Sequence, residues 1–168
     1  MKMTVDQALD AAEAGGFTFN HGLIVITCVG WAESRFVTDA RNTNPNGSID
    51  RGWLQINSVH TDISDAECDD PATAAAYAWD HISNHGASFS AWVAYTSGAY
   101  KGADNTVWTM VSKARLARQL QSDLNAAQAT INGLQDNNIA LAGALAQCSV
   151  QKNNLANKIS GAIGLLQS

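Results

Sequence analysis

Two carboxylic acids within one short segment have the residue types needed for acid chemistry on a sugar bond. Glu33 ends an apolar run that begins at Leu23, and Asp50 follows in a stretch rich in Asn, Thr and Gly. Burial against apolar neighbours raises the pKa of a carboxyl group, whereas amide donors favour its charged form. We therefore expect Glu33 to hold a proton and Asp50 to be ionised. A proton donor and an anion are the pair that cleavage of a glycosidic bond requires.

Each of these residues also has an ordinary structural explanation. A glutamate at the end of a helix is commonly a solvated side chain, and an aspartate after a hairpin commonly helps to form the turn. The occurrence of Glu33 and Asp50 at this spacing, inside one motif, favours the catalytic interpretation.

The elements that position the two acids have recognisable local signals. Thr4 and Gln7 form a capping-box pattern, which predicts a helix that ends at Gly15 and Gly16. The run from 23 to 31 is apolar on nearly every face, which is typical of a helix buried at the centre of a small domain. Glu33 would lie at its end.

A small β-hairpin region is expected after the apolar helix and before the helix over 72–84. Asn46 and Gly47 form a strong hairpin turn between Thr43 and Ile49. Downstream, Asp69 and Asp70 before Pro71 predict a helix over 72–84, and helices are expected again from residues 90 and 105. The predicted fold class is α+β, mainly α.

The C-terminal part, from residue 113, has a heptad pattern. Twelve of fourteen a and d positions are apolar or Cys, which indicates a coiled coil. The d positions are Leu120, Ala127, Leu134, Leu141, Cys148, Leu155 and Ala162, and the a positions are Leu124, Ile131, Asn138, Leu145, Lys152, Ile159 and Leu166. The polar a residues resemble those that set the register of parallel coiled coils. We predict self-association; the alternative is a helix that packs on the first domain or folds back as a hairpin.

Composition and charge restrict the partners. With 168 residues, 46% of them hydrophobic and 15% charged, the chain is expected to form one compact domain with a smaller appendage. The predicted division is 1–112, with five basic and thirteen acidic residues, and 113–168, with five basic and two acidic residues. A net charge of −5 is the wrong sign for phosphate neutralisation, so nucleic acid is not an expected partner.

Several other classes of protein and site are not expected. The first residues lack the pattern of a secretory signal, and no apolar stretch approaches the ~20 residues needed to cross a bilayer. The three cysteines and four histidines show no ligand spacing, and the acidic run 62–70 lacks the Gly and Glu of a calcium loop. We predict no metal site and no cofactor.

The segment 33–58 resembles animal-type (c-type) lysozymes. The similarity is carried by Glu-Ser-x-Phe, Asn-x-Asn-x-x-Gly-Ser-x-Asp and Gly-x-Leu-Gln-Ile-Asn-Ser, which align without a gap. The flanks, 11–17 and 89–100, look more like the soluble lytic transglycosylase-type lysozyme domains of bacteriophages. Together these resemblances cover about residues 5–110 and imply a lysozyme-like domain.

The resemblance implies roles for individual residues. Glu33 matches the catalytic acid and Asp50 the second carboxylate, with Asn44 matching an amide that holds Asp50. Gln55 and Asn57 match residues that line the sugar cleft, although they could equally hydrogen-bond the hairpin itself.

Two aromatic residues are further candidates for substrate contact. Tyr95 falls where transglycosylases carry a tyrosine that faces the acid, but Thr96 replaces their usual asparagine. The apolar neighbours of most tryptophans favour core packing, and Trp53 is the best candidate for a cleft residue among them.

The expected function is that of a peptidoglycan muramidase, which hydrolyses the β-1,4 bond between N-acetylmuramic acid and N-acetylglucosamine. One alternative is a lytic transglycosylase that leaves anhydro ends, and another is a non-catalytic virion module. The flanks predict a bacteriophage protein, located in the virion or in the host cytoplasm before release. Its expected partners are bacterial peptidoglycan and either a second copy or a virion or tail protein bound through the coiled coil.

Overall fold

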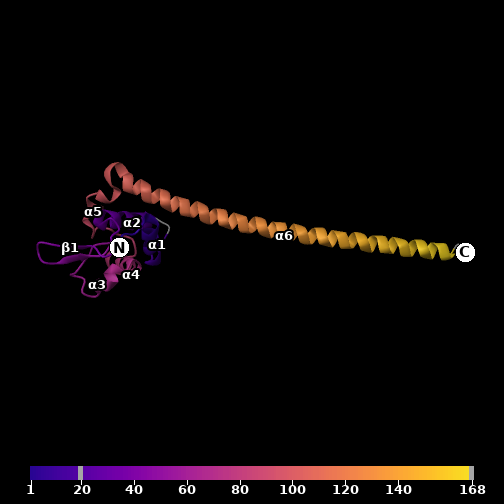
Figure 1. Ribbon diagram of the computed structural model, residues 1–168, viewed down its shortest axis with the longest axis horizontal. Coiled ribbons are helices and arrows are strands. Elements are labelled where there is room, and N and C mark those ends of the chain that lie inside the picture. Colours follow the sequence, from indigo (N-terminus) through magenta and orange to yellow (C-terminus); the bar gives the residue numbers. More distant parts are fainter. Residues whose placement is uncertain (19–20, 167–168) are drawn as a thin grey trace. The chain divides into compact units, whose positions relative to one another are not determined.

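The computed structural model describes residues 1–18 and 21–166, with side chains described as far as residue 160. The predicted fold class is confirmed: the chain is mainly helical, with one small antiparallel sheet and a long C-terminal helix (Figure 1). The chain divides into two compact units, Met1–Gln119 and Leu120–Ser168.

The first two helices form as their local signals predict. Helix α1 (Val5–Ala14) begins with a reciprocal capping box between Thr4 and Gln7, and Gly15 caps its end. Helix α2 (His21–Ser34) is the apolar helix, and most of its residues from 23 to 30 are buried. The close approach of α2 to Trp53 depends on Gly30, because a Cβ there would lie 2.3 Å from the indole.

The sheet consists of three short antiparallel strands in the order β1 (Arg41–Thr43), β2 (Ile49–Arg51) and β3 (Ile56–Asn57). The hairpin turn between β1 and β2 is confirmed, because Thr43 pairs with Ile49 and Gly47 adopts a positive φ of 82°. In this register Asp50 lies on the central strand, between Asn42 of β1 and Asn57 of β3.

The predicted helix over 72–84 divides into two elements. Helix α4 (Pro71–Tyr77) is capped by Asp70, and it continues as a π-helical segment, η1 (Ala78–Ile82). Positive φ angles at Asn84, His85 and Gly86 then turn the chain away. A short helix that was not predicted, α3 (Asp65–Asp69), precedes α4.

The helix expected from residue 90 begins three residues later. Helix α5 covers only Val93–Thr96, because Trp92 keeps an extended backbone and its indole N–H bonds to the carbonyl of Leu54. Two 3-10 segments follow, η2 (Ala99–Lys101) and η3 (Ala103–Asn105).

Helix α6 (Thr106–Leu166) starts within the first unit and continues into the second. In the first unit, Val107 and Val111 are buried in the core, and Arg118 forms ion pairs with Asp10 and Glu13. The boundary between the two compact units therefore lies after Gln119. The division into a catalytic domain 1–112 and a helical segment 113–168 stays a prediction.

In the second unit, every a and d position from Leu120 to Ile159 is exposed. The side chains of the last two predicted heptad positions, Ala162 and Leu166, lie outside the described residues. Among the described helices, α6 included, there is no segment both long and apolar enough to cross a membrane.

Candidate active site

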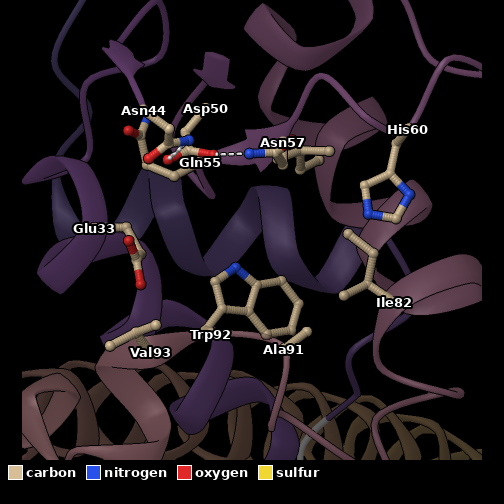
Figure 2. Close-up of a pocket in the computed structure, with 11 residues that line it drawn as sticks. Glu33, Asn44, Asp50, Gln55, Asn57, His60, Ile82, Ala91, Trp92 and Val93 are labelled. Atoms are coloured by element: carbon tan, nitrogen blue, oxygen red, sulfur yellow. Dashed lines mark hydrogen bonds between the residues drawn. The ribbon is translucent and has the colours of Figure 1, made fainter. Parts of the chain in front are cut away.

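A pocket of about 290 Å³ brings the end of α2 together with the sheet and with a third segment around residue 92. Figure 2 shows Glu33 at one side, the polar side chains of the sheet region along another, and Trp92 across from them. The lining residues are Glu33, Asn44, Asp50, Gln55, Ile56, Asn57, His60, Ile82, Ala91, Trp92 and Val93.

Glu33 lies at the penultimate position of α2 and is partly buried. Burial of the carboxyl group raises its pKa, and the negative charge of Asp50 raises it further. The backbone N–H of Ala94, 3.4 Å from Oε1, opposes this shift by donating to the charged form. The predicted direction of the Glu33 pKa is therefore confirmed, and burial is its largest cause.

Ser34 holds the end of α2 against the sheet region. Its Oγ donates both to the carbonyl of Gly30, at 3.2 Å, and to the carbonyl of Trp53, at 2.9 Å. The helix ends there because Arg35 and Phe36 adopt positive φ angles of 56° and 67°. These contacts set the position of Glu33 relative to the loop after β2.

Asp50 accepts hydrogen bonds from three asparagine amides. Asn57 donates to Oδ1 at 2.6 Å, while Asn44 at 3.0 Å and Asn42 at 3.4 Å donate to Oδ2. Both carboxylate oxygens are therefore acceptors, and the expectation that amides surround Asp50 is confirmed. The arrangement follows from strand pairing, which places Asn42 and Asn57 directly beside Asp50.

Ser48 orients two of these amides and was not predicted as a site residue. Its Oγ accepts from Asn44 at 3.2 Å and from Asn57 at 3.0 Å, and it donates to Asn46 at 2.8 Å. Its signal was present in the hairpin motif, since the serine lies two residues before Asp50.

Gln55 and Asn57 both line the pocket, but their amides are used differently. The Gln55 Nε2 donates to the carbonyls of Gly52, at 2.8 Å, and Ala40, at 3.4 Å, so this amide nitrogen stabilises the loop. Asn57 contributes directly to the setting of Asp50. Both amide nitrogens therefore donate within the hairpin region, as the alternative expects, and both residues also line the pocket.

Trp53 is a core residue, and its prediction as a cleft residue is wrong. Its side chain is fully buried, and its indole N–H donates to the carbonyl of Pro71 at 3.1 Å. The indole packs against Gly30 of α2, so the side chain points from the loop after β2 into the core. Its ring therefore packs in the core, as the apolar neighbours of most tryptophans had favoured, and does not face a substrate.

Tyr95 packs against two aromatic rings and is not among the residues that line the pocket. Its ring centroid lies 5.1 Å from that of Tyr100 and 5.6 Å from that of Phe89. Its neighbour Ala94 supplies the backbone donor to Glu33 instead.

The apolar wall of the pocket contains residues that the sequence patterns did not single out. Trp92 was expected in the core; it is largely buried, yet its exposed remainder lines the pocket. Its indole N–H donates to the carbonyl of Leu54 at 2.8 Å. His60 and Ile82 lie at the other end from Glu33 (Figure 2), and no sequence signal marked either of them.

Within residues 1–18 and 21–166, no group of three or more His, Cys, Asp or Glu side chains is arranged to hold a metal ion. Glu33 and Asp50 place two carboxyl groups at one pocket, an arrangement suited to proton transfer to a bound molecule.

One protein-family model matches the chain. The family is described as a lysozyme-like domain, and the match covers residues 9–94, which is half of the chain and includes all residues that line the pocket. No curated protein matches the sequence.

Proposed function

The chain belongs to the lysozyme-like domain family, a family that acts on peptidoglycan, and we propose that it is a muramidase. In this proposal it hydrolyses the β-1,4 bond between N-acetylmuramic acid and N-acetylglucosamine. The observation that carries the proposal is the shared pocket of Glu33, whose pKa is raised, and Asp50, which accepts three amide hydrogen bonds.

Glu33 would act as the general acid. A protonated carboxyl group donates its proton to the glycosidic oxygen while the bond from that oxygen to the anomeric carbon breaks. Lysozymes use two carboxylic acids in these roles, and the roles are transferred here from that resemblance. Partial burial and the charge of Asp50 support the role of Glu33, because both keep its proton bound at higher pH.

Asp50 would support the positive charge that develops on the anomeric carbon, or attack that carbon to form a covalent intermediate. Its amide partners hold the carboxylate in position without neutralising its charge, since amides are neutral donors. Water then completes the hydrolysis, with Glu33 accepting its proton as general base.

The product spectrum tests this proposal against the transglycosylase alternative. Hydrolysis adds water and leaves reducing muramic acid ends, whereas a transglycosylase uses the 6-hydroxyl of muramic acid and leaves anhydro ends. Mass spectrometry of purified peptidoglycan digested by the chain should give the hydrated products. Two observations favour hydrolysis. Asp50 supplies a second carboxyl group in the pocket, and Tyr95, which matches the tyrosine that faces the acid in transglycosylases, does not line the pocket. Dominant anhydro products would contradict the muramidase proposal.

A zymogram tests whether the pocket is catalytic at all. Wild-type protein should clear embedded peptidoglycan, and the Glu33→Gln variant should not. Absence of clearing by folded wild-type protein would favour the non-catalytic alternative, a binding or structural module of a virion.

We also propose, from the resemblance of segments 11–17 and 89–100, that the protein is encoded by a bacteriophage. It would then reach the cell wall either as part of the virion or from the host cytoplasm during lysis. Mass spectrometry of purified virions distinguishes the two: peptides of the chain in stoichiometric amounts indicate a virion component, and their absence indicates a lysis enzyme.

A further inference from the structure

The exposed helix, defined as residues 120–160 of α6, carries a stripe of exposed apolar side chains. Eight large apolar side chains at its a and d positions are between 47% and 69% exposed. They are Leu120, Leu124, Ile131, Leu134, Leu141, Leu145, Leu155 and Ile159.

A helix of this kind needs a partner for its stripe. Isolated helices in water gain little stability from the backbone alone, and most helical stability in proteins comes from burial of an apolar face. Gly133 and Gly143 lie inside the exposed helix, and a Cβ at either position would meet nothing within 4 Å apart from its own stretch of helix, so neither glycine is required by packing in this structure. Both weaken the isolated helix.

We propose that the partner is a second copy of the exposed helix, paired antiparallel and centred between Ile139 and Ala140. The distribution of charge favours this orientation. Asp123 and Asp136 lie in the first half of the exposed helix, and Lys152 and Lys158 in the second half. All four side chains are exposed, and their heptad positions decide which of them would face a second helix.

A parallel pair would bring like charges together. Lys152 occupies an a position, so in a parallel, in-register pair it would face Lys152 of the second copy inside the interface. In the antiparallel register, Lys152 faces Ala127 of the second copy, whose small side chain leaves room for the lysine stem to extend to solvent. Asp123 and Lys158, both at g positions, then lie opposite each other twice in the pair.

The same register matches the remaining layers. Every a residue faces a d residue of the second copy: Leu120 with Ile159, Leu124 with Leu155, Ile131 with Cys148, Leu134 with Leu145, and Asn138 with Leu141. The small Cys148 side chain thus meets a larger one, as tight packing requires. The two Asn138 amides are three residues apart along the pair, about 4.5 Å at 1.5 Å per residue, so they can hydrogen-bond each other.

Cys148 distinguishes the two orientations. In a parallel, in-register pair the two Cys148 side chains would face each other at one d layer and could form a disulfide. In the antiparallel register they are offset by seventeen residues, roughly 25 Å along the axis, which is far beyond disulfide reach. Cys28 and Cys68 are buried, so Cys148 is the exposed thiol among the three cysteines.

The test uses the full chain. Size-exclusion chromatography with light scattering in reductant should give twice the chain mass of 17.8 kDa. Mild oxidation should then produce no covalent dimer from wild type but an efficient one from Ile131→Cys, whose new thiol faces Cys148 of the second copy. The matched control, Ile131→Cys combined with Cys148→Ser, should not cross-link. Peptidoglycan clearing by each variant shows that the first unit remains folded.

Three results would overturn the proposal. A mass of 17.8 kDa at micromolar concentration would exclude the second copy as the occupant of the stripe. A covalent dimer of wild type through Cys148 would show the parallel orientation. Cross-linking of the control variant as strongly as of Ile131→Cys would exclude the proposed register.

Discussion

At the residue scale, the proton on Glu33 is the feature on which the proposed reaction depends. Replacement by glutamine preserves the size and shape of the side chain but removes the transferable proton. We expect Glu33→Gln to lower kcat on purified peptidoglycan by about 10²- to 10⁴-fold, the usual contribution of a general acid. Release of soluble muropeptides measures the effect, and a loss below about tenfold would remove Glu33 from the reaction.

The pH dependence of stability gives an independent check on Glu33. Its pKa in the folded protein is raised, chiefly by burial, so the wild type loses stability as pH rises through that pKa. Below the pKa of the unfolded state, the folded and unfolded chains both carry the proton, and no difference arises. Glu33→Gln should therefore unfold at the same temperature as wild type in acid and at a higher temperature at neutral pH, as measured by calorimetry.

The charge of Asp50 should be visible in the titration of Glu33. Because that charge contributes to the raised pKa of Glu33, Asp50→Asn should lower this pKa and shift the alkaline limb of any remaining activity to lower pH. NMR titration of the Glu33 carboxyl carbon measures the shift directly, without requiring activity. An unchanged or higher pKa of Glu33 in the variant would contradict the electrostatic contact between the two acids.

At the element scale, the two strands that flank β2 each provide an asparagine amide that donates to Asp50. The bond from Asn57 on β3 is short, 2.6 Å, while that from Asn42 on β1 is long, 3.4 Å. We expect Asn57→Ala to lower kcat by about tenfold or more, which corresponds to about 1.4 kcal/mol in the transition state. Asn42→Ala is the matched control and should have a smaller effect; equal losses would mean that the sheet does not orient Asp50 in this way.

The packing of α2 against Trp53 can be tested with two glycines. Gly30→Ala adds a Cβ 2.3 Å from the buried indole, and such overpacking costs about 1–3 kcal/mol of unfolding free energy. Gly143→Ala, in the exposed helix, meets no neighbour and should stabilise that helix by up to about 1 kcal/mol. Thermal unfolding followed by circular dichroism separates the two, and a stable Gly30→Ala variant would mean that α2 can shift relative to Trp53.

At the scale of the whole molecule, charge sets the approach to the substrate. Residues 1–112 hold thirteen acidic and five basic residues, so an anionic cell wall would repel this part of the chain. Salt screens repulsion between like charges over about 8–10 Å at physiological ionic strength. We expect turbidity clearance of anionic walls to stay constant or rise as salt increases from low to physiological concentration. A steep fall with salt would indicate a basic binding surface instead.

Several parts of the molecule could be predicted because their causes are local in the sequence. The Thr4 capping box, the apolar run of α2 and the Asn46–Gly47 turn each act within a few residues, and all three elements form as expected. The hairpin turn in addition brings Asn44 close to Asp50, so part of the site was also predictable.

The amino-acid sequence by itself determined the two acids, their spacing and the short elements that carry them. The tertiary structure alone decided that Trp92 rather than Trp53 lines the pocket, that His60 and Ile82 form its far end, and that the Ala94 N–H reaches Glu33. The reason is physical: these placements depend on packing between segments far apart in the chain, and a tryptophan has the same apolar ring in the sequence whether it faces the core or the pocket.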